Sequence, residues 1–169
     1  MRPMEEIWKP EVTVAALIVQ DGRYLMIEEH TRDGLRLNQP AGHLDPGESL
    51  VDAVIREALE ESTRAFTPTG LQGTYLCTSL SSKTGLPVTY LRFAFTGTAG
   101  EPIPGRNHDT GIVRALWMTL AEVRASAARH RSPLVLKCVE DHAAGKPAVP
   151  LDLLYTDPSV GTLTAGVRS

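Results

Sequence analysis

The order of the expected elements predicts an α+β fold, a sandwich built around a mixed β-sheet. Two β-branched, apolar runs near the N-terminus are joined by the turn Asp21-Gly22, and a stretch with helical periodicity follows at residues 50–65. Further strands and then two helices complete the chain, an order that favours one sheet covered by helices. No internal repeat or linker divides residues 1–169, so we expect a single domain.

Residue types predict the first strands. Residues 12–20 and 24–28 are rich in β-branched and apolar side chains, and the Asp-Gly pair between them is typical of a hairpin turn. Two antiparallel strands are therefore expected. Residues 35–38 predict a short strand that leads into the turn residues 39–42.

Residues 50–65 are predicted to form a helix. The apolar residues there recur at helical spacing and are expected to face the core. Ser49 or Asp45 is a suitable N-cap, and Pro68 ends the helical option.

The second half of the chain adds strands, a loop and two helices. We expect strands at residues 73–80, 88–98 and 112–118, and helices at residues 120–128 and 133–144. Ser132 and Pro133 are an N-cap and N1 pair that opens the last helix, and Gly145 stops it. Residues 101–107, EPIPGRN, predict a mobile loop, and the chain after residue 150 predicts an irregular tail.

Composition excludes several classes of partner. The net charge of −3 gives no electrostatic footprint for duplex nucleic acid or for an anionic membrane. No apolar run has the length of a membrane span, and the first ten residues lack the apolar core of a signal peptide. Cys77 and Cys138 have no metal-ligand spacing and make no disulfide framework, so a reduced cytoplasmic setting is expected.

Three carboxylates share one face of the helix predicted at residues 50–65. Glu57, Glu60 and Glu61 stand at i, i+3 and i+4, where like charges repel by a few tenths of a kcal/mol, roughly, for each pair. A hard divalent cation, Mg²⁺ or Mn²⁺, explains this density of oxygen ligands. The alternative is a solvated helix face with Arg56 and Arg64 as counter-charges.

The wider spacing supports the metal site. A glycine, five residues, a glutamate, seven residues, Arg-Glu, two residues and Glu-Glu follow one another over residues 42–61. This pattern resembles the core of the Nudix box, which we place at residues 42–64. The resemblance implies an α/β/α sandwich in which a loop-helix-loop carries the box. It also implies a hydrolase of phosphoanhydrides with Mg²⁺, or Mn²⁺, as cofactor.

The end of the box departs from the family pattern. Thr63 stands at the usual glycine and Arg64 at the usual apolar residue. A glycine at this place supplies the left-handed residue that stops a helix, and β-branched threonine is poor there. We therefore expect the helix to run on past Thr63.

Roles for the box residues are implied by their positions in the family. Glu60 and Glu61 correspond to metal ligands, joined by the backbone carbonyl of Ala41. Glu57 corresponds to a ligand or to the base that takes a proton from water, and which glutamate is the base stays open. Any of the three is thus a candidate catalytic residue.

Three further residues of the box are expected to be structural. Arg56 would brace the loop through a bidentate contact to Glu48, and Gly42 is the third structural residue. The alternative for the Glu48 carboxylate is a place in the metal shell. Many family members add an acid from a distant loop, and Asp109 is the first candidate here, with Glu101 second; either can equally be an ordinary loop charge.

Candidate substrate-binding residues flank the box. Asn38 and His43 belong to the stretch NQPAGHL, and His43 either faces the phosphates or is a turn residue. Arg92 lies in the strand YLRFAF on the same face as Tyr90, where it either grips a leaving phosphate or forms a salt bridge to a neighbouring strand.

The stretches NQPAGHL, Leu91-Arg92-Phe93 and RSPLV at residues 131–135 resemble a bacterial phosphatase subgroup of the Nudix family. The resemblance implies a phosphatase of low selectivity that acts on nucleoside di- and triphosphates and on hydroxymethylpyrimidine and thiamine diphosphates. The alternatives are a pyrophosphohydrolase of sugar nucleotides or dinucleoside polyphosphates, and a non-catalytic nucleotide sensor. The expected partner is a small phosphoanhydride, and the protein is expected to be a monomer or a homodimer. The apolar tail is expected either to close over the site or to pack between the subunits of a dimer.

Overall fold

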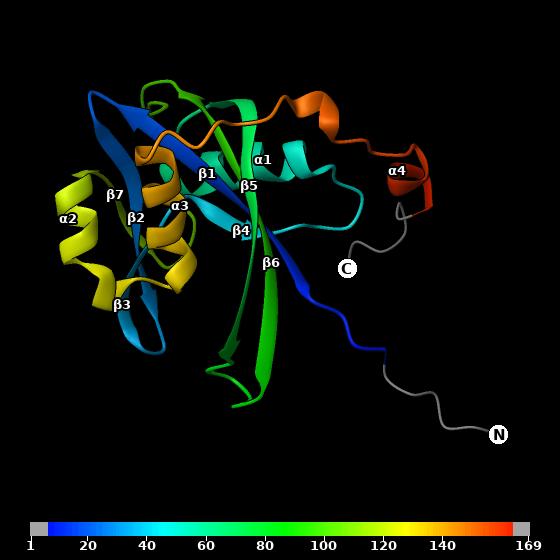
Figure 1. Cartoon of the computed structure of the whole chain (residues 1–169), viewed down its shortest axis with the longest axis horizontal. Helices are drawn as coiled ribbons and strands as arrows, with labels where there is room; N and C mark the ends of the chain where they lie inside the picture. The colour runs from blue at the N-terminus through cyan, green and yellow to red at the C-terminus, as the bar shows by residue number, and fades with distance from the viewer. Residues whose placement is uncertain (1–6, 164–169) are drawn as a thin grey trace.

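A computed structural model describes residues 7–163 of the chain (Figure 1). Its strands are β1 (Glu11–Gln20), β2 (Arg23–Thr31), β3 (Gly34–Asn38), β4 (Ala41–His43), β5 (Phe66–Leu80), β6 (Pro87–Ala99) and β7 (Ile112–Thr119). Its helices are α1 (Leu50–Ser62), α2 (Leu120–Ala125), α3 (Pro133–Ala143) and α4 (Ser159–Leu163), with single turns η1 (Ala127–Arg129) and η2 (Leu151–Leu153). Among these described elements, no helix has both the length and the apolar character needed to cross a membrane.

The strands form a mixed sheet with β1 at its centre. The order is β3-β2-β1-β6-β5, with β4 also paired to β1 and β7 to β2. β1 runs parallel to β6 and antiparallel to both β2 and β4. β5 and β6 form a long hairpin whose far end extends beyond the other strands (Figure 1). The predicted mixed sheet is therefore confirmed.

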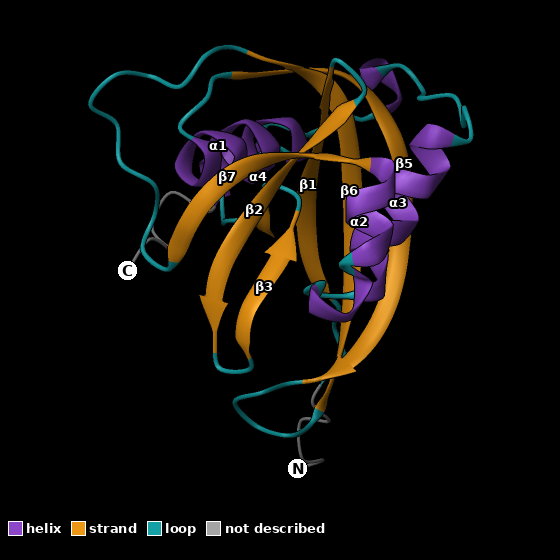
Figure 2. Cartoon of the chain, turned by 90° about the vertical axis from the view of Figure 1, so that its left-hand side faces the viewer, coloured by secondary structure: helices purple, strands orange, loops and turns teal. Residues whose placement is uncertain are grey.

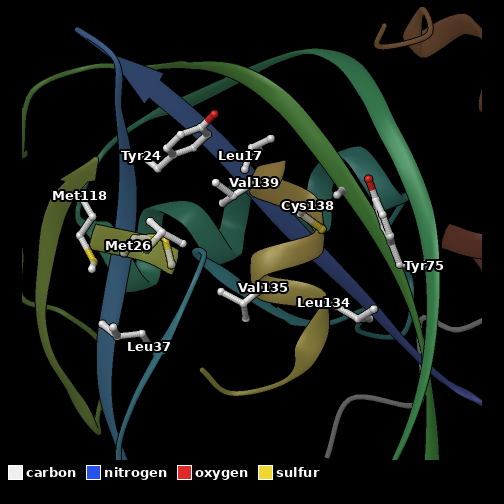
Figure 3. Packing of buried hydrophobic residues seen from close by; sticks show 12 residues of the cluster. Leu17, Tyr24, Met26, Leu37, Tyr75, Met118, Leu134, Val135, Cys138 and Val139 are labelled. Carbon is white, nitrogen blue, oxygen red and sulfur yellow. The ribbon is translucent and has the colours of Figure 1, made fainter. Parts of the chain in front are cut away.

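Helices cover both faces of the sheet (Figure 2). On one face, α1 contributes Ala53, Val54 and Ala58 to an apolar cluster with strand residues such as Phe95. On the other face, α2 and α3 pack on a second cluster, in which Val135 and Val139 of α3 lie near Met26 and Leu17 (Figure 3). This arrangement is the α/β/α sandwich that the family resemblance implies, and the predicted α+β class is confirmed.

Helix α1 ends where the family pattern places its stop, so the prediction that it continues past Thr63 is wrong. Ser49 caps the start by accepting a hydrogen bond from the Asp52 amide. At the other end Thr63 adopts the left-handed conformation, with φ 61°, and its amide donates to the Leu59 carbonyl at 3.0 Å. Thr63 is only 5% exposed, so tertiary packing holds a conformation that threonine disfavours by itself.

The loop between β6 and β7 supplies that packing. It contains the stretch EPIPGRN, and it lies against the C-terminal end of α1 rather than apart from the domain. Three contacts satisfy carbonyls at the helix end: Ile103 N to Thr63 O at 2.9 Å, His108 Nδ1 to Glu61 O at 2.7 Å, and Asp109 N to Glu60 O at 2.9 Å. These contacts accompany the left-handed cap that Thr63 makes where other helices have glycine.

Several element boundaries differ from the predicted ones. β5 begins at Phe66 instead of residue 73, because irregularities at Pro68/Gly70 and Leu71/Gly73 break its alternation without ending its pairing to β6. The helix predicted at residues 120–128 is divided into α2 and η1 at Ser126.

The chain after residue 150 is less irregular than predicted. It contains the turn η2 and the short helix α4, and its residues 164–169 lie outside the described part. Leu151 and Leu154 pack against the apolar cluster under α1, whereas Leu153 and Tyr155 are exposed.

We expect Glu28→Gln to destabilise the fold by about 1 to 3 kcal/mol, because it removes a buried carboxylate bound by two cations. Glu28 is 6% exposed and accepts hydrogen bonds from Arg129 and from Arg114, and these arginines lower the pKa of its carboxyl. A lowered folded-state pKa gives stability that is present above the unfolded pKa and is lost as the pH falls. Urea unfolding at pH 7 and pH 4 checks this, since the cost of the substitution must be smaller at pH 4.

Candidate functional site

One cleft brings the predicted site residues together. It has a volume of about 780 Å³ and lies between the carboxylate face of α1, the strand β4 and the β5–β6 hairpin. All of the predicted site residues line it except Glu48, namely Asn38, Ala41, Gly42, His43, Arg56, Glu57, Glu60, Glu61, Arg92 and Asp109. A volume of this size suits a small organic ligand.

Glu61 is the carboxylate most affected by its surroundings. It is partly buried, and the Ala41 amide donates a hydrogen bond to its Oε2 at 3.0 Å. Burial raises the pKa of the Glu61 carboxyl to about 9, and the negative charges of Glu57, Glu29 and Asp109 act in the same direction, against the Ala41 amide. An acid held among other acids in this way is stabilised by a bound cation.

Arg56 binds the carboxylates of the box. Its Nε and Nη2 donate to the two oxygens of Glu48, at 2.5 and 3.0 Å, in a bidentate pair. Its Nη1 donates to Glu57 at 2.9 Å and to Glu60 at 3.2 Å, and its Nη2 also reaches the His43 carbonyl. Because both Glu48 oxygens accept from Arg56 and Glu48 does not line the cleft, this geometry favours the bracing role over a place in a metal shell.

Gly42 leaves room for the Glu57 side chain. A Cβ atom at position 42 would lie 2.1 Å from Glu57 Oε1, far inside van der Waals contact. Burial raises the pKa of the Glu57 carboxyl, with Arg56 acting in the opposite direction. Any side chain at position 42 would therefore displace the Glu57 carboxylate from the place it occupies here.

The oxygen ligands on offer in the cleft are of the type that a hard divalent cation prefers. Three carboxylates and the backbone of Ala41 face one part of the cleft, with no sulfur or imidazole among them. Within residues 7–163, no three acidic, histidine or cysteine side chains are already gathered at ligand distance. Arg56 Nη1 contacts one oxygen of Glu57 and one oxygen of Glu60, and the second oxygen of each carboxylate is not bound by Arg56.

Arg92 is held by amides. It is 6% exposed, and it donates to Gln39 Oε1 at 2.9 Å and to Asn38 Oδ1 at 3.1 Å. The Gln39 amide is fixed in turn by a hydrogen bond from Nε2 to the Val135 carbonyl at 2.8 Å. Among the residues that the structure describes, Arg92 does not form the salt bridge given above as one alternative, and its guanidinium has no carboxylate partner.

The other candidates differ in their surroundings. His43 is exposed, 3.6 Å from Glu11, and its ring centroid lies 6.4 Å from that of Tyr90. Asp109 lines the cleft because its amide is bound to the end of α1. Glu101 does not line it; this side chain is 87% exposed and lies 4.0 Å from Arg64.

Several residues that line the cleft or support it were not predicted from the sequence, and they lie mainly on strands and just before α3. Glu29 faces the cleft beside a register shift between β2 and β7, and two consecutive glutamates in a strand were its only signal. Gln39 is 1% exposed, which composition does not predict. Arg36 and Arg131 also line the cleft.

We expect the melting temperature of the protein in EDTA to fall as the pH rises from about 5 to about 9. A carboxyl whose folded-state pKa is raised favours the folded state while protonated, and that stability is lost as the pH rises. For Glu61 the window runs from 4.5 to about 9, and the raised pKa of Glu57 acts in the same direction. Calorimetry of Glu61→Gln should show a flatter pH profile; an unchanged slope would contradict this account of the Glu61 environment.

A family model described as the NUDIX domain matches residues 9–138 of the chain. The chain belongs to the Nudix family. Proteins called phosphatase NudJ are curated relatives of this Nudix chain: that of Escherichia coli K12 is 32% identical over 148 residues, which cover 88% of this chain and 92% of the relative. The NudJ of Shigella flexneri matches to the same extent.

Solved structures give the same assignment. A NUDIX hydrolase from Nitrosomonas europaea has 51% sequence identity and a TM-score of 0.81, covering 88% of this chain and 98% of its own. A UDP-X diphosphatase, with 16% identity and a TM-score of 0.65 over 87% of this chain and 69% of its own, shares the fold. The protein is thus a Nudix hydrolase of phosphoanhydrides. Nudix hydrolases generally use divalent metal ions and act on small phosphate-containing molecules.

Proposed function

We propose that this Nudix protein is an Mg²⁺-dependent phosphatase of low selectivity. Its substrates would be nucleoside di- and triphosphates together with hydroxymethylpyrimidine diphosphate and thiamine diphosphate. The observation that carries the proposal is the carboxylate face of α1, which lines a cleft together with a buried arginine that has no acidic partner among the described residues. The likeness to proteins named as phosphatases supports removal of a single phosphate.

The box residues take the roles expected from their positions. Glu60, Glu61 and the Ala41 carbonyl would hold Mg²⁺, or Mn²⁺ in its place, and Glu57 would be a further ligand or the proton acceptor. The bound metal would neutralise charge on the phosphates and lower the pKa of the attacking water. Glu57 can accept a proton from water because it is partly buried and faces the same part of the cleft.

Other residues would position the substrate. Arg92 is fixed by Asn38 and Gln39, so its guanidinium is already oriented when a phosphate arrives. His43 lies at the rim near Tyr90 and would contact the outer part of the substrate. Asp109 would add an acid next to Glu61, whose pKa its charge already affects.

The size of the cleft is also compatible with one alternative activity. About 780 Å³ also accommodates a sugar nucleotide, for which cleavage would release two phosphate-containing products. Incubation with CTP, GDP and ADP-ribose in Mg²⁺, with products resolved by chromatography, separates the two activities. Orthophosphate from CTP and GDP supports the proposal, whereas AMP plus ribose phosphate from ADP-ribose, with the other two substrates intact, supports the alternative. Nucleotide binding without turnover of any substrate would indicate a sensor.

A further inference from the structure

Charge is distributed unequally around the cleft. Arg56 is bound by acids of the box, but three other arginines that line the cleft are not neutralised in this way. Arg92 contacts amide oxygens, and Arg36 forms no ion pair with any residue between 7 and 163. Arg131 has only a long contact, 3.8 Å, to Glu29, and its own side chain is 51% exposed. The three arginines therefore outnumber the two acids, Glu29 and Asp33, that line the cleft on β2 and on the turn before β3.

These three arginines are gathered around strand β3. Arg36 and Asn38 stand two residues apart on β3 and so share a face, and Asn38 accepts the hydrogen bond from Arg92. The Arg131 amide donates to the carbonyl of Leu37, the residue between them, at 2.8 Å.

Glu29 connects this group to the carboxylate face of α1. It is the cross-strand partner of Arg36, which puts their Cβ atoms about 5 Å apart, and it is the acid nearest Arg131. The charge of Glu29 also acts on Glu61. Glu29 thus lies near two of the three arginines, Arg36 and Arg131, between them and the acidic part of the cleft.

A buried guanidinium without a counter-charge is unfavourable, because amide partners satisfy its hydrogen bonds but leave its charge. Arg92 is such a group, and the amides that hold it are themselves buried: Asn38 is 8% and Gln39 1% exposed. The planar fork of arginine matches the oxygens of a phosphate. Helix α3 begins at Pro133, next to Arg131, and its N-terminus adds favourable potential for an anion.

We propose that Arg36, Arg92 and Arg131 form a subsite for the phosphate that stays on the organic product. The inference rests on the proposed phosphatase function, since the transferred phosphate would lie at the carboxylate face and the retained one at the arginines. The ligand class is a phosphomonoester of a small organic alcohol, such as a nucleoside monophosphate. Binding there needs no metal, so a phosphomonoester binds the metal-free protein and inhibits turnover competitively, whereas the parent alcohol does neither.

Calorimetric titration of the full chain in EDTA tests the subsite, with CMP and cytidine as probes. We expect CMP to bind and cytidine to give no measurable heat. Arg131→Gln and Arg36→Gln should each weaken CMP binding about tenfold, the effect of losing one charge-assisted contact. Arg23→Gln is the matched control, because Arg23 lies on β2, pairs with Glu122 and does not line the cleft. Melting curves establish that each variant is folded.

Equal binding of CMP and cytidine would overturn the subsite, as would CMP affinities in Arg131→Gln and Arg36→Gln that match the Arg23→Gln control. The two proposals can fail separately. A protein that releases orthophosphate but whose CMP affinity is unchanged in both variants retains the proposed function and loses the subsite. A protein that binds CMP through these arginines but never releases orthophosphate retains the subsite and loses the proposed function.

Discussion

Glu61→Gln abolishes Mg²⁺-dependent turnover while the protein stays folded; this is the largest effect we expect from a single substitution. The change removes the charge of one proposed metal ligand but keeps the shape of the side chain. Loss of one ligand of a catalytic metal removes several kcal/mol of transition-state stabilisation, so kcat should fall by about 10³-fold or more. Glu61 lies in the most acidic part of the cleft, where the charges of Glu57, Glu29 and Asp109 reach it.

Orthophosphate release from GDP at saturating Mg²⁺ measures the loss. Glu140→Gln is the matched control, because Glu140 is a helical carboxylate of α3 that pairs with Arg124 and does not line the cleft. Near-wild-type activity of Glu61→Gln would remove Glu61 from the metal site. A cooperative melting curve for the variant in EDTA separates a catalytic loss from a folding defect.

Gly42→Ala should lower kcat by about 10²-fold with little change in the circular dichroism spectrum. The new Cβ would meet Glu57 Oε1 at 2.1 Å and its Cδ at 2.2 Å, so the carboxylate must leave its position. A shift of about 1 Å in a catalytic group is enough for such a loss. The backbone of Gly42 itself does not need glycine, since its φ is not positive.

The control for this prediction is Gly100→Ala. Gly100 has no positive φ, and a Cβ atom there would meet nothing within 4 Å. If Gly42→Ala and Gly100→Ala have the same activity, the Glu57 carboxylate is not needed where the structure places it. If Gly42→Ala loses activity because it is partly unfolded, as a large fall in its unfolding free energy would show, the substitution instead disrupts strand β4.

Local patterns predict the parts of this protein that depend on local physics. Helical periodicity places α1, and the i, i+3, i+4 spacing puts three carboxylates on one face of it. Ser132 and Pro133 place the start of α3 correctly, since the Ser132 hydroxyl accepts from the Leu134 amide. The contact between Arg56 and Glu48 is also found where the box pattern indicates it.

Features that depend on distant segments are not predictable in this way. The stop of α1 at Thr63 needs contacts from the loop around Ile103 and His108, more than 35 residues away. The environment of Arg92 depends on the amides of Asn38 and Gln39, at the end of β3, and on helix α3, which only the folded chain brings together. Neither residue type nor periodicity carries information on such pairings.

The central claim is that the protein is a metal-dependent phosphatase. Its most direct test is hydrolysis of GDP in H₂¹⁸O, with the products separated and their masses measured by mass spectrometry. If water attacks the terminal phosphorus, as a phosphatase requires, the label appears in orthophosphate and GMP is unlabelled. Turnover should require Mg²⁺ or Mn²⁺ and be absent in Glu61→Gln. Label in GMP would place the attack at the inner phosphorus, and unchanged turnover in EDTA would contradict a metal site on the carboxylate face of α1.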